Sequence, residues 1–103
     1  MQIYFYEVGK PARLMEIENE LEPMQELVGG YIETVTISGG YVIVCDEDGK
    51  WKSKKPNAYI CTSSGILDIL VGDFFVCKVD GCEFASISEE DIPNVNKYIR
   101  RVM

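Results

Sequence analysis

The sequence predicts a single α+β domain over residues 1–103, in which an antiparallel sheet of about five or six strands is covered by two or three helices. Short runs rich in β-branched and aromatic residues alternate with glycine-containing turns, which is typical of hairpins. Two other segments, one near the N-terminus and one at the C-terminus, repeat apolar residues at spacings of three and four, which is typical of amphipathic helices. The 103 residues are 47% hydrophobic, enough for one core.

The N-terminal third is predicted to hold one strand and two helical segments. Residues 2–8 have strong β propensity and predict a strand. An N-proximal amphipathic helix is predicted over residues 12–22, because its apolar residues recur on one face. Pro23 suits the first turn of a helix better than its interior, so the segment EPMQELV is expected to restart as a short helix. The glycines after Val28 are expected to end it.

The middle of the chain predicts a hairpin followed by a basic loop. Residues 31–37 and 41–45 are two β-rich runs around a glycine turn. The next turn, DEDG at residues 46–49, offers acidic side chains that accept from backbone donors. Residues 50–57 (KWKSKKPN) form a basic loop, and residues 59–62 are expected to be a short strand.

The C-terminal part predicts a second hairpin and a helix. Residues 66–71 are compatible with a helical turn or with a strand, since a short apolar run does not settle the period. A strand over residues 73–79 turns through VDGC into residues 83–87. A C-terminal helix is expected to follow, with Ser88 or Asp91 as its N-cap.

Acidic residues concentrate in the N-terminal half. The net charge is −7, and residues 1–49 contain ten acids against two bases. Such a balance disfavours nucleic acid and anionic membranes and favours a basic partner. The predicted partner-binding residues are the acids of the helical region, namely Glu16, Glu18, Glu20, Glu22 and Glu26.

The residue types also exclude most catalytic templates. There is no histidine, which removes imidazole bases, catalytic triads and histidine-containing metal sites. The four cysteines lack the close pairing of zinc sites, and Cys45 and Cys77 lie in apolar runs typical of a core. We therefore expect no enzyme, metal or cofactor. The sequence shows no signal peptide or membrane span, which predicts a cytoplasmic protein.

Two alternative functions rest on other residues. A small-ligand (nucleotide or metabolite) binding protein would bring five polar side chains from separate elements into one pocket. These possible ligand-binding residues are Gln25, Glu33, Asp46, Asn57 and Asp73. A nucleic-acid module would use Trp51 with the loop lysines and the pair Arg100 and Arg101.

The segments MQELVGGYIETV, VCDEDGKWKSKKPN, DILVGDFFV and SISEEDI occur in that order along nearly the whole chain. This pattern resembles a family of small uncharacterised proteins encoded by phages, plasmids and other bacterial mobile elements. The length, the acidity and the opening MQIYFYEVGKPARL are also similar to a small anti-CRISPR protein that inhibits a type II-A effector nuclease.

The resemblance implies a non-enzymatic inhibitor in the cytoplasm of the bacterial host. Its expected partner is a type II CRISPR effector nuclease or its guide RNA complex, which is basic where it holds RNA and DNA. The implied mode is protein contact, with an acidic surface competing with nucleic acid. Neither direct nucleic-acid binding nor membrane binding is expected, and the protein is expected to be a monomer or a small homo-oligomer.

Overall fold

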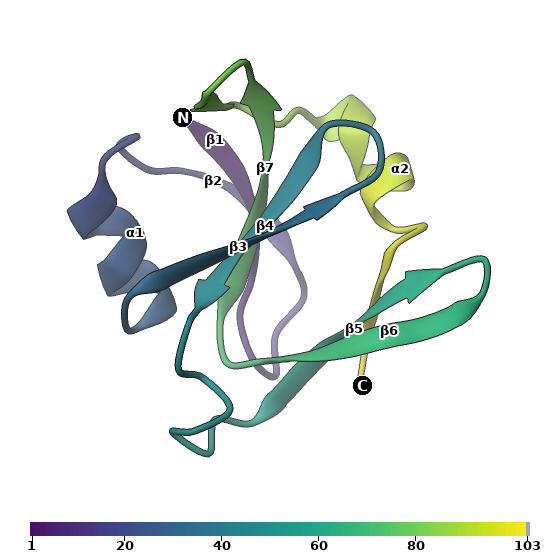
Figure 1. The fold of residues 1–103 in the computed structure, drawn as a ribbon. Coiled ribbons are helices and arrows are strands. Elements are labelled where there is room, and N and C mark those ends of the chain that lie inside the picture. Colours follow the sequence, from purple (N-terminus) through teal and green to yellow (C-terminus); the bar gives the residue numbers. More distant parts are fainter. Residues whose placement is uncertain (103) are drawn as a thin grey trace.

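Two antiparallel sheets make up most of the structure, a computed structural model that describes residues 1–102 (Figure 1). The strands are β1 (Gln2–Tyr6), β2 (Arg13–Glu16), β3 (Ile32–Ile37), β4 (Tyr41–Asp46), β5 (Pro56–Thr62), β6 (Gly65–Val71), β7 (Phe74–Asp80), β8 (Glu83–Ala85) and β9 (Ile99–Arg101). The six-stranded sheet has the order β2-β1-β7-β4-β3, with β8 paired to β7, and the three-stranded sheet has the order β6-β5-β9. The predicted α+β class is confirmed, with more strands than expected.

The larger sheet is covered on both faces. Helix α1 (Leu21–Val28) packs on one face, and the smaller sheet with helix α2 (Ile92–Val95) packs on the other (Figure 1). Side chains of β7 alternate between the two sides: Phe74 and Val76 face the smaller sheet, while Phe75 and Cys77 join the cluster under α1. This double burial explains why the central strands are continuous apolar runs rather than alternating ones.

The short helix α1 forms as its sequence predicts. Pro23 occupies the third helical position, where its missing N–H costs nothing. Met24 and Val28 are the buried residues of the helix. Gly29 ends it in the left-handed conformation, with φ of +82°, and its N–H donates to the carbonyl of Gln25.

The predicted N-proximal helix over residues 12–22 is wrong. Residues Arg13–Glu16 instead form strand β2, which pairs with β1. Leu14 packs against the cluster between the sheets and Met15 against the cluster under α1, so this segment has the two-residue period of a strand. Ile17, three positions after Leu14, packs with Met15 against the cluster under α1, so Leu14 and Ile17 lie on opposite sides and not on one helical face.

The predicted C-terminal helix is also much shorter than expected. A 3₁₀ turn at Glu89–Asp91 leads into α2, after which residues Ile99–Arg101 form strand β9 against β5. Of the two predicted N-caps, Ser88 caps the 3₁₀ turn, and the Asp91 carboxylate accepts from both the N–H and the hydroxyl of Ser88. Pairing with β5 satisfies an edge that a longer helix would leave open.

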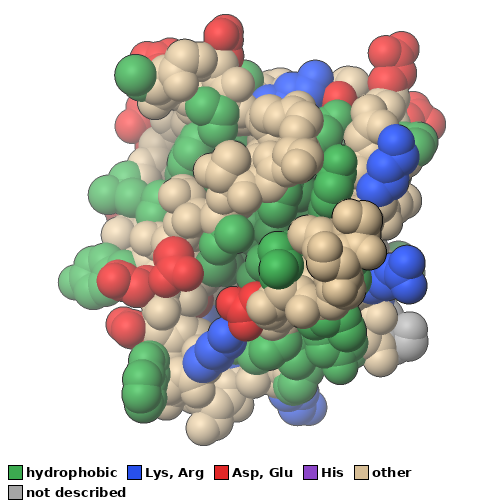
Figure 2. All heavy atoms as spheres, turned by 45° about the vertical axis from the view of Figure 1, so that its right-hand side comes forward, with side chains coloured by type: hydrophobic (Ala, Val, Ile, Leu, Met, Phe, Trp, Pro, Cys, Tyr) green, Lys and Arg blue, Asp and Glu red, His purple; other side chains and the backbone are tan. Residues whose placement is uncertain are grey.

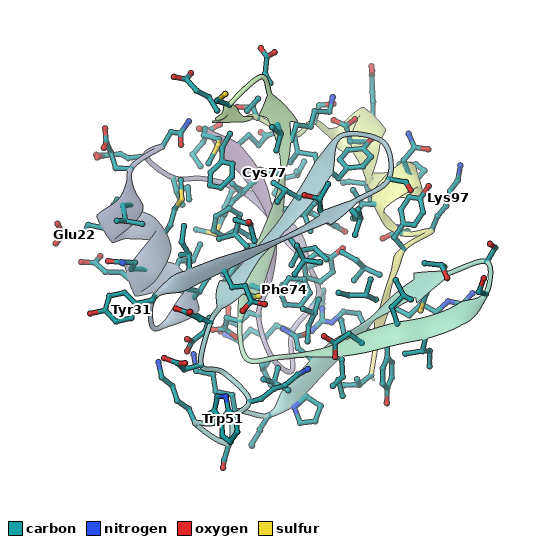
Figure 3. The ribbon with its side chains drawn as sticks, viewed as in Figure 1. Glu22, Tyr31, Trp51, Phe74, Cys77 and Lys97 are labelled. Atoms are coloured by element: carbon teal, nitrogen blue, oxygen red, sulfur yellow. The ribbon has the colours of Figure 1, made fainter. Side chains whose placement is uncertain are left out.

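The remaining elements agree with the prediction, which leaves residues 66–71 undecided between helix and strand. Strands β3 and β4 form the predicted hairpin, and β7 and β8 form the second one, with β8 shorter than expected. Residues 66–71, compatible with helix or strand, belong to strand β6. The basic loop lies between β4 and β5 and carries Trp51, whose side chain is largely exposed (Figure 3).

Candidate functional site

Four glutamates surround one shallow depression at the start of α1. Glu18 and Glu20 come from the loop before the helix, Glu22 from its first turn and Glu26 from its last turn. All four are exposed, and Glu22 points away from the sheet (Figure 3). We call these four residues the acidic face. Acidic side chains at a helix N-terminus also interact favourably with the helix dipole, which helps to keep Glu20 and Glu22 there.

Glu16, the fifth predicted partner-binding residue, lies apart from this set. It ends strand β2, and its carboxylate is 3.2 Å from the amino group of Met1. The structure therefore brings four of the five predicted glutamates around one depression.

The four carboxylates of the acidic face are not neutralised by ion pairs within residues 1–102. Glu22 and Glu26 are four positions apart on the helix, where like charges repel. The face turned forward in Figure 2 is different, because it carries both acidic and basic side chains. Four carboxylates without an ion pair among residues 1–102 are therefore gathered around one depression at α1.

Replacing Glu26 with lysine is expected to raise the free energy of unfolding by a few tenths of a kcal/mol, roughly 0.3 to 0.8. The new cation would face Glu22 one turn away and would lie in the last turn, near the negative end of the helix dipole. Urea denaturation at low salt measures the gain, and Glu22→Lys is the matched comparison. Because Glu22 lies in the first turn, its replacement is expected to destabilise; equal effects of the two substitutions would contradict this electrostatic explanation.

Asp46, one of the five possible ligand-binding residues, is committed to internal contacts. Its side chain is fully buried, and its carboxylate lies 2.9 Å from the ammonium of Lys52 and 2.6 Å from that of Lys54. Its other oxygen accepts from the N–H of Asp48. Burial would raise the pKa of Asp46, but these three donors outweigh it and lower the pKa from 3.8 to about 2.

The two lysines also complete the end of α1. Lys54 donates to the carbonyl of Val28 and Lys52 to that of Gly29, where a helix leaves acceptors without partners. Gly30 passes so close that an added Cβ would lie 2.6 Å from the Asp46 carboxylate. The basic loop is thus a clamp between α1 and β4. The sequence showed these lysines only as a charged loop, because their partners are far along the chain.

The other four possible ligand-binding residues lie in separate places. Glu33 is exposed on β3 beside Asp46, in a depression that also contains Trp51. Asn57 is buried, and its amide group donates to the carbonyls of Tyr6 and Gly72. Asp73 accepts from the N–H of Val8. Gln25, on α1, belongs to none of the depressions that contain the others.

The cations of the nucleic-acid alternative are largely engaged within the fold. Lys50 pairs with Asp68 at 2.7 Å, and Lys52 and Lys54 hold Asp46. The guanidinium group of Arg101 donates to the carbonyls of Glu7, Lys10 and Asn57. These contacts engage four of the predicted cations, whereas Lys55 and Arg100 are exposed.

Three of the four cysteines are buried. Burial raises the pKa of the Cys77 thiol to about 12, and burial with the nearby carboxylates of Glu33 and Asp46 raises that of Cys45 to about 11. Such thiols are poor nucleophiles and poor ligands. Cys82, in the β7–β8 turn, is exposed. Its position outside an apolar run is the sequence feature that indicates this exposure.

Within residues 1–102, no group of three acidic or cysteine side chains is arranged to hold a metal ion. Over the same residues, every helix is too short and too polar to cross a bilayer.

Comparison with known proteins identifies the family. The model of a domain of unknown function, DUF3846, matches residues 1–102. The chain belongs to the DUF3846 family. Neither the curated proteins nor the solved structures gave a match. In this DUF3846 domain, the motif VGGYIE begins at the end of α1, and its two glycines serve the helix cap and the close approach to Asp46.

Proposed function

We propose that this protein is a non-enzymatic inhibitor, encoded by a bacterial mobile element, that binds a basic protein through the acidic face. The supporting observation is that Glu18, Glu20, Glu22 and Glu26 surround one depression and that no ion pair among residues 1–102 neutralises them. The proposed partner is a type II-A RNA-guided effector nuclease or its guide RNA complex, in the cytoplasm of the bacterial host. The sequence resemblance supports this choice of partner.

The proposed mechanism is electrostatic competition. A channel that holds guide RNA and target DNA presents lysine and arginine side chains to phosphate groups. Carboxylates on a folded protein would pair with the same cations, and the protein could not be cleaved as a substrate. Such contacts accelerate encounter and weaken as salt screens the charges. The small-ligand alternative stays a prediction, and the dispersal of its five residues gives it no shared pocket.

The test is a DNA-cleavage assay with a purified type II-A effector. The protein is added before or after guide loading, at low and at raised salt. Wild type is expected to inhibit, and inhibition is expected to weaken as salt rises. A variant with lysine at all four positions of the acidic face is expected to inhibit at least tenfold more weakly, because attraction becomes repulsion.

The matched control also replaces four acids with lysine, so its net charge is the same. Its positions are exposed and do not line the depression of the acidic face: Glu47, Asp80, Glu89 and Glu90. Circular dichroism confirms that both variants fold. Equal loss of inhibition in both variants would make net charge, rather than the acidic face, responsible. No inhibition by a large excess of folded wild type would refute the proposed partner.

A further inference from the structure

A groove of about 550 Å³ lies beside the acidic face, between the start of α1 and the β7–β8 turn. Its apolar lining residues are Leu21, Met24, Ile32 and Phe84, of which Leu21 is exposed. Glu20 and Leu21 line both this groove and the depression of the acidic face, so the two surfaces are continuous.

The walls of the groove are held in place by the core. Met24 is buried, and the half-buried Ile32 and Phe84 pack against the hydrophobic cluster under α1. The amide group of Asn19 donates to the carbonyl of Phe84, which ties the loop before α1 to β8. A partner would therefore meet an open groove whose walls are already in place, and would lose little free energy to ordering them.

Leu21 is unusual for a residue at the start of an amphipathic helix. Its side chain is 56% exposed, although the helix has an apolar side on which Met24 and Val28 are buried. Covering it, together with the groove walls, would remove apolar surface from water at about 25 cal/mol per Å².

Charge selects the occupant. Glu20 and Glu83 line the groove, neither takes part in an ion pair among residues 1–102, and the acidic face adjoins it. A segment with an apolar side chain between lysine or arginine residues would place the apolar side chain against the apolar walls and the cations against the glutamates. A second copy of this chain that docked through the same face would bring its own acidic residues to the same place and would be repelled.

We propose that this groove is an anchor pocket for one apolar side chain of a basic segment of the partner protein. The proposal rests on the proposed function, because the acidic face would hold the cations on either side of the anchor. The charges contribute affinity that falls as salt rises. The anchor contributes a preference for an apolar residue, and this preference does not depend on salt.

The test uses two fluorescein-labelled peptides of lysine and arginine, one with a single central phenylalanine and one with serine in its place. Fluorescence anisotropy measures binding at low and at physiological salt. The phenylalanine peptide is expected to bind about tenfold more tightly, since burying the ring adds favourable free energy. This ratio is expected to persist when salt weakens both peptides. Equal affinities would overturn the anchor pocket.

Matched variants locate the effect. Leu21→Asn removes the exposed apolar side chain of the groove lining and is expected to reduce the ratio severalfold. Leu67→Asn alters a similarly exposed leucine, at 67%, on β6 and is expected to leave the ratio unchanged. If Leu21→Asn left the ratio unchanged, the phenylalanine would bind elsewhere and the proposal would be overturned.

Cys82 supplies an independent readout because it lines the groove and is exposed, whereas Cys45, Cys61 and Cys77 are buried. The phenylalanine peptide is expected to slow alkylation of Cys82 by N-ethylmaleimide severalfold, and the serine peptide at equal saturation is not. An unchanged rate would overturn the proposal. These assays contain no nuclease, so the anchor pocket and the proposed inhibition succeed or fail separately.

Discussion

Replacing Asp46 with asparagine is expected to lower the free energy of unfolding by about 2 to 3 kcal/mol at neutral pH. The carboxylate is fully buried and holds Lys52 and Lys54, which in turn hold the end of α1. The variant would leave two ammonium groups facing a neutral amide. We place the loss below that of a wholly buried ion pair because the lysine side chains are 42% and 22% exposed. Urea denaturation measures it.

The same substitution is expected to change the acid sensitivity of the fold. The pKa of Asp46 is lowered from 3.8 to about 2, so its contribution is fully present above about pH 4 and is lost as pH falls towards 2. The difference in stability between wild type and variant should therefore shrink across that range. Asp91 also has a pKa lowered to about 2, because the backbone N–H of Ser88 and the side chains of Tyr41, Lys78 and Ser88 outweigh its burial. Because both proteins contain it, its effect cancels in the comparison.

Asp68→Asn is the matched control for this experiment. It breaks an ion pair with Lys50 in which both side chains are about half exposed, and it is expected to change stability by less than about 1 kcal/mol. If Asp46→Asn were no more destabilising than Asp68→Asn, the clamp between the basic loop and α1 would not be a stabilising element.

Replacing Phe74 with alanine is expected to lower the free energy of unfolding by about 3 to 5 kcal/mol. The ring lies between the two sheets (Figure 3) and is fully buried. It stacks on Tyr6 at a centroid distance of 4.5 Å. Its removal leaves a cavity at the junction of the two sheets. Thermal and urea denaturation measure the loss.

A loss of that size approaches the whole stability of many small domains, so a milder variant is needed. Phe74→Leu keeps much of the volume and is expected to cost about 1 to 2 kcal/mol. Val79→Ala is the control on the same strand, because Val79 is 41% exposed; it is expected to cost less than about 1 kcal/mol. Tolerance of Phe74→Leu at the level of Val79→Ala would show that the sheets are not joined through this ring.

Local chemistry made several elements predictable. The turn residues placed the β3–β4 and β7–β8 hairpins, and Pro23 and Gly29 placed the start and the end of α1. Ser88, one of the two predicted N-caps, caps the 3₁₀ turn before α2. Each of these features depends on interactions between residues only a few positions apart, so a short stretch of sequence contains both partners.

Pairing over long distances was not predictable in the same way. Strand β2 looked helical until β1 supplied its partner, and β9 looked helical until β5 did. Apolar spacing in a short segment fits either period, and the choice depends on which strand edge lies nearby. The acidic face shows the same division, since sequence named its glutamates but only the fold separated Glu16 from the other four.

The sequence by itself determined the acidic charge, the absence of histidine chemistry, the hairpin turns and the apolar runs that fill the core. Only the tertiary structure decided that Asp46 is buried between two lysines rather than open to a ligand, and that Leu21 and Phe84 line one groove. The physical reason is that burial and proximity belong to residues distant along the chain, which meet only when the two sheets and α1 pack together.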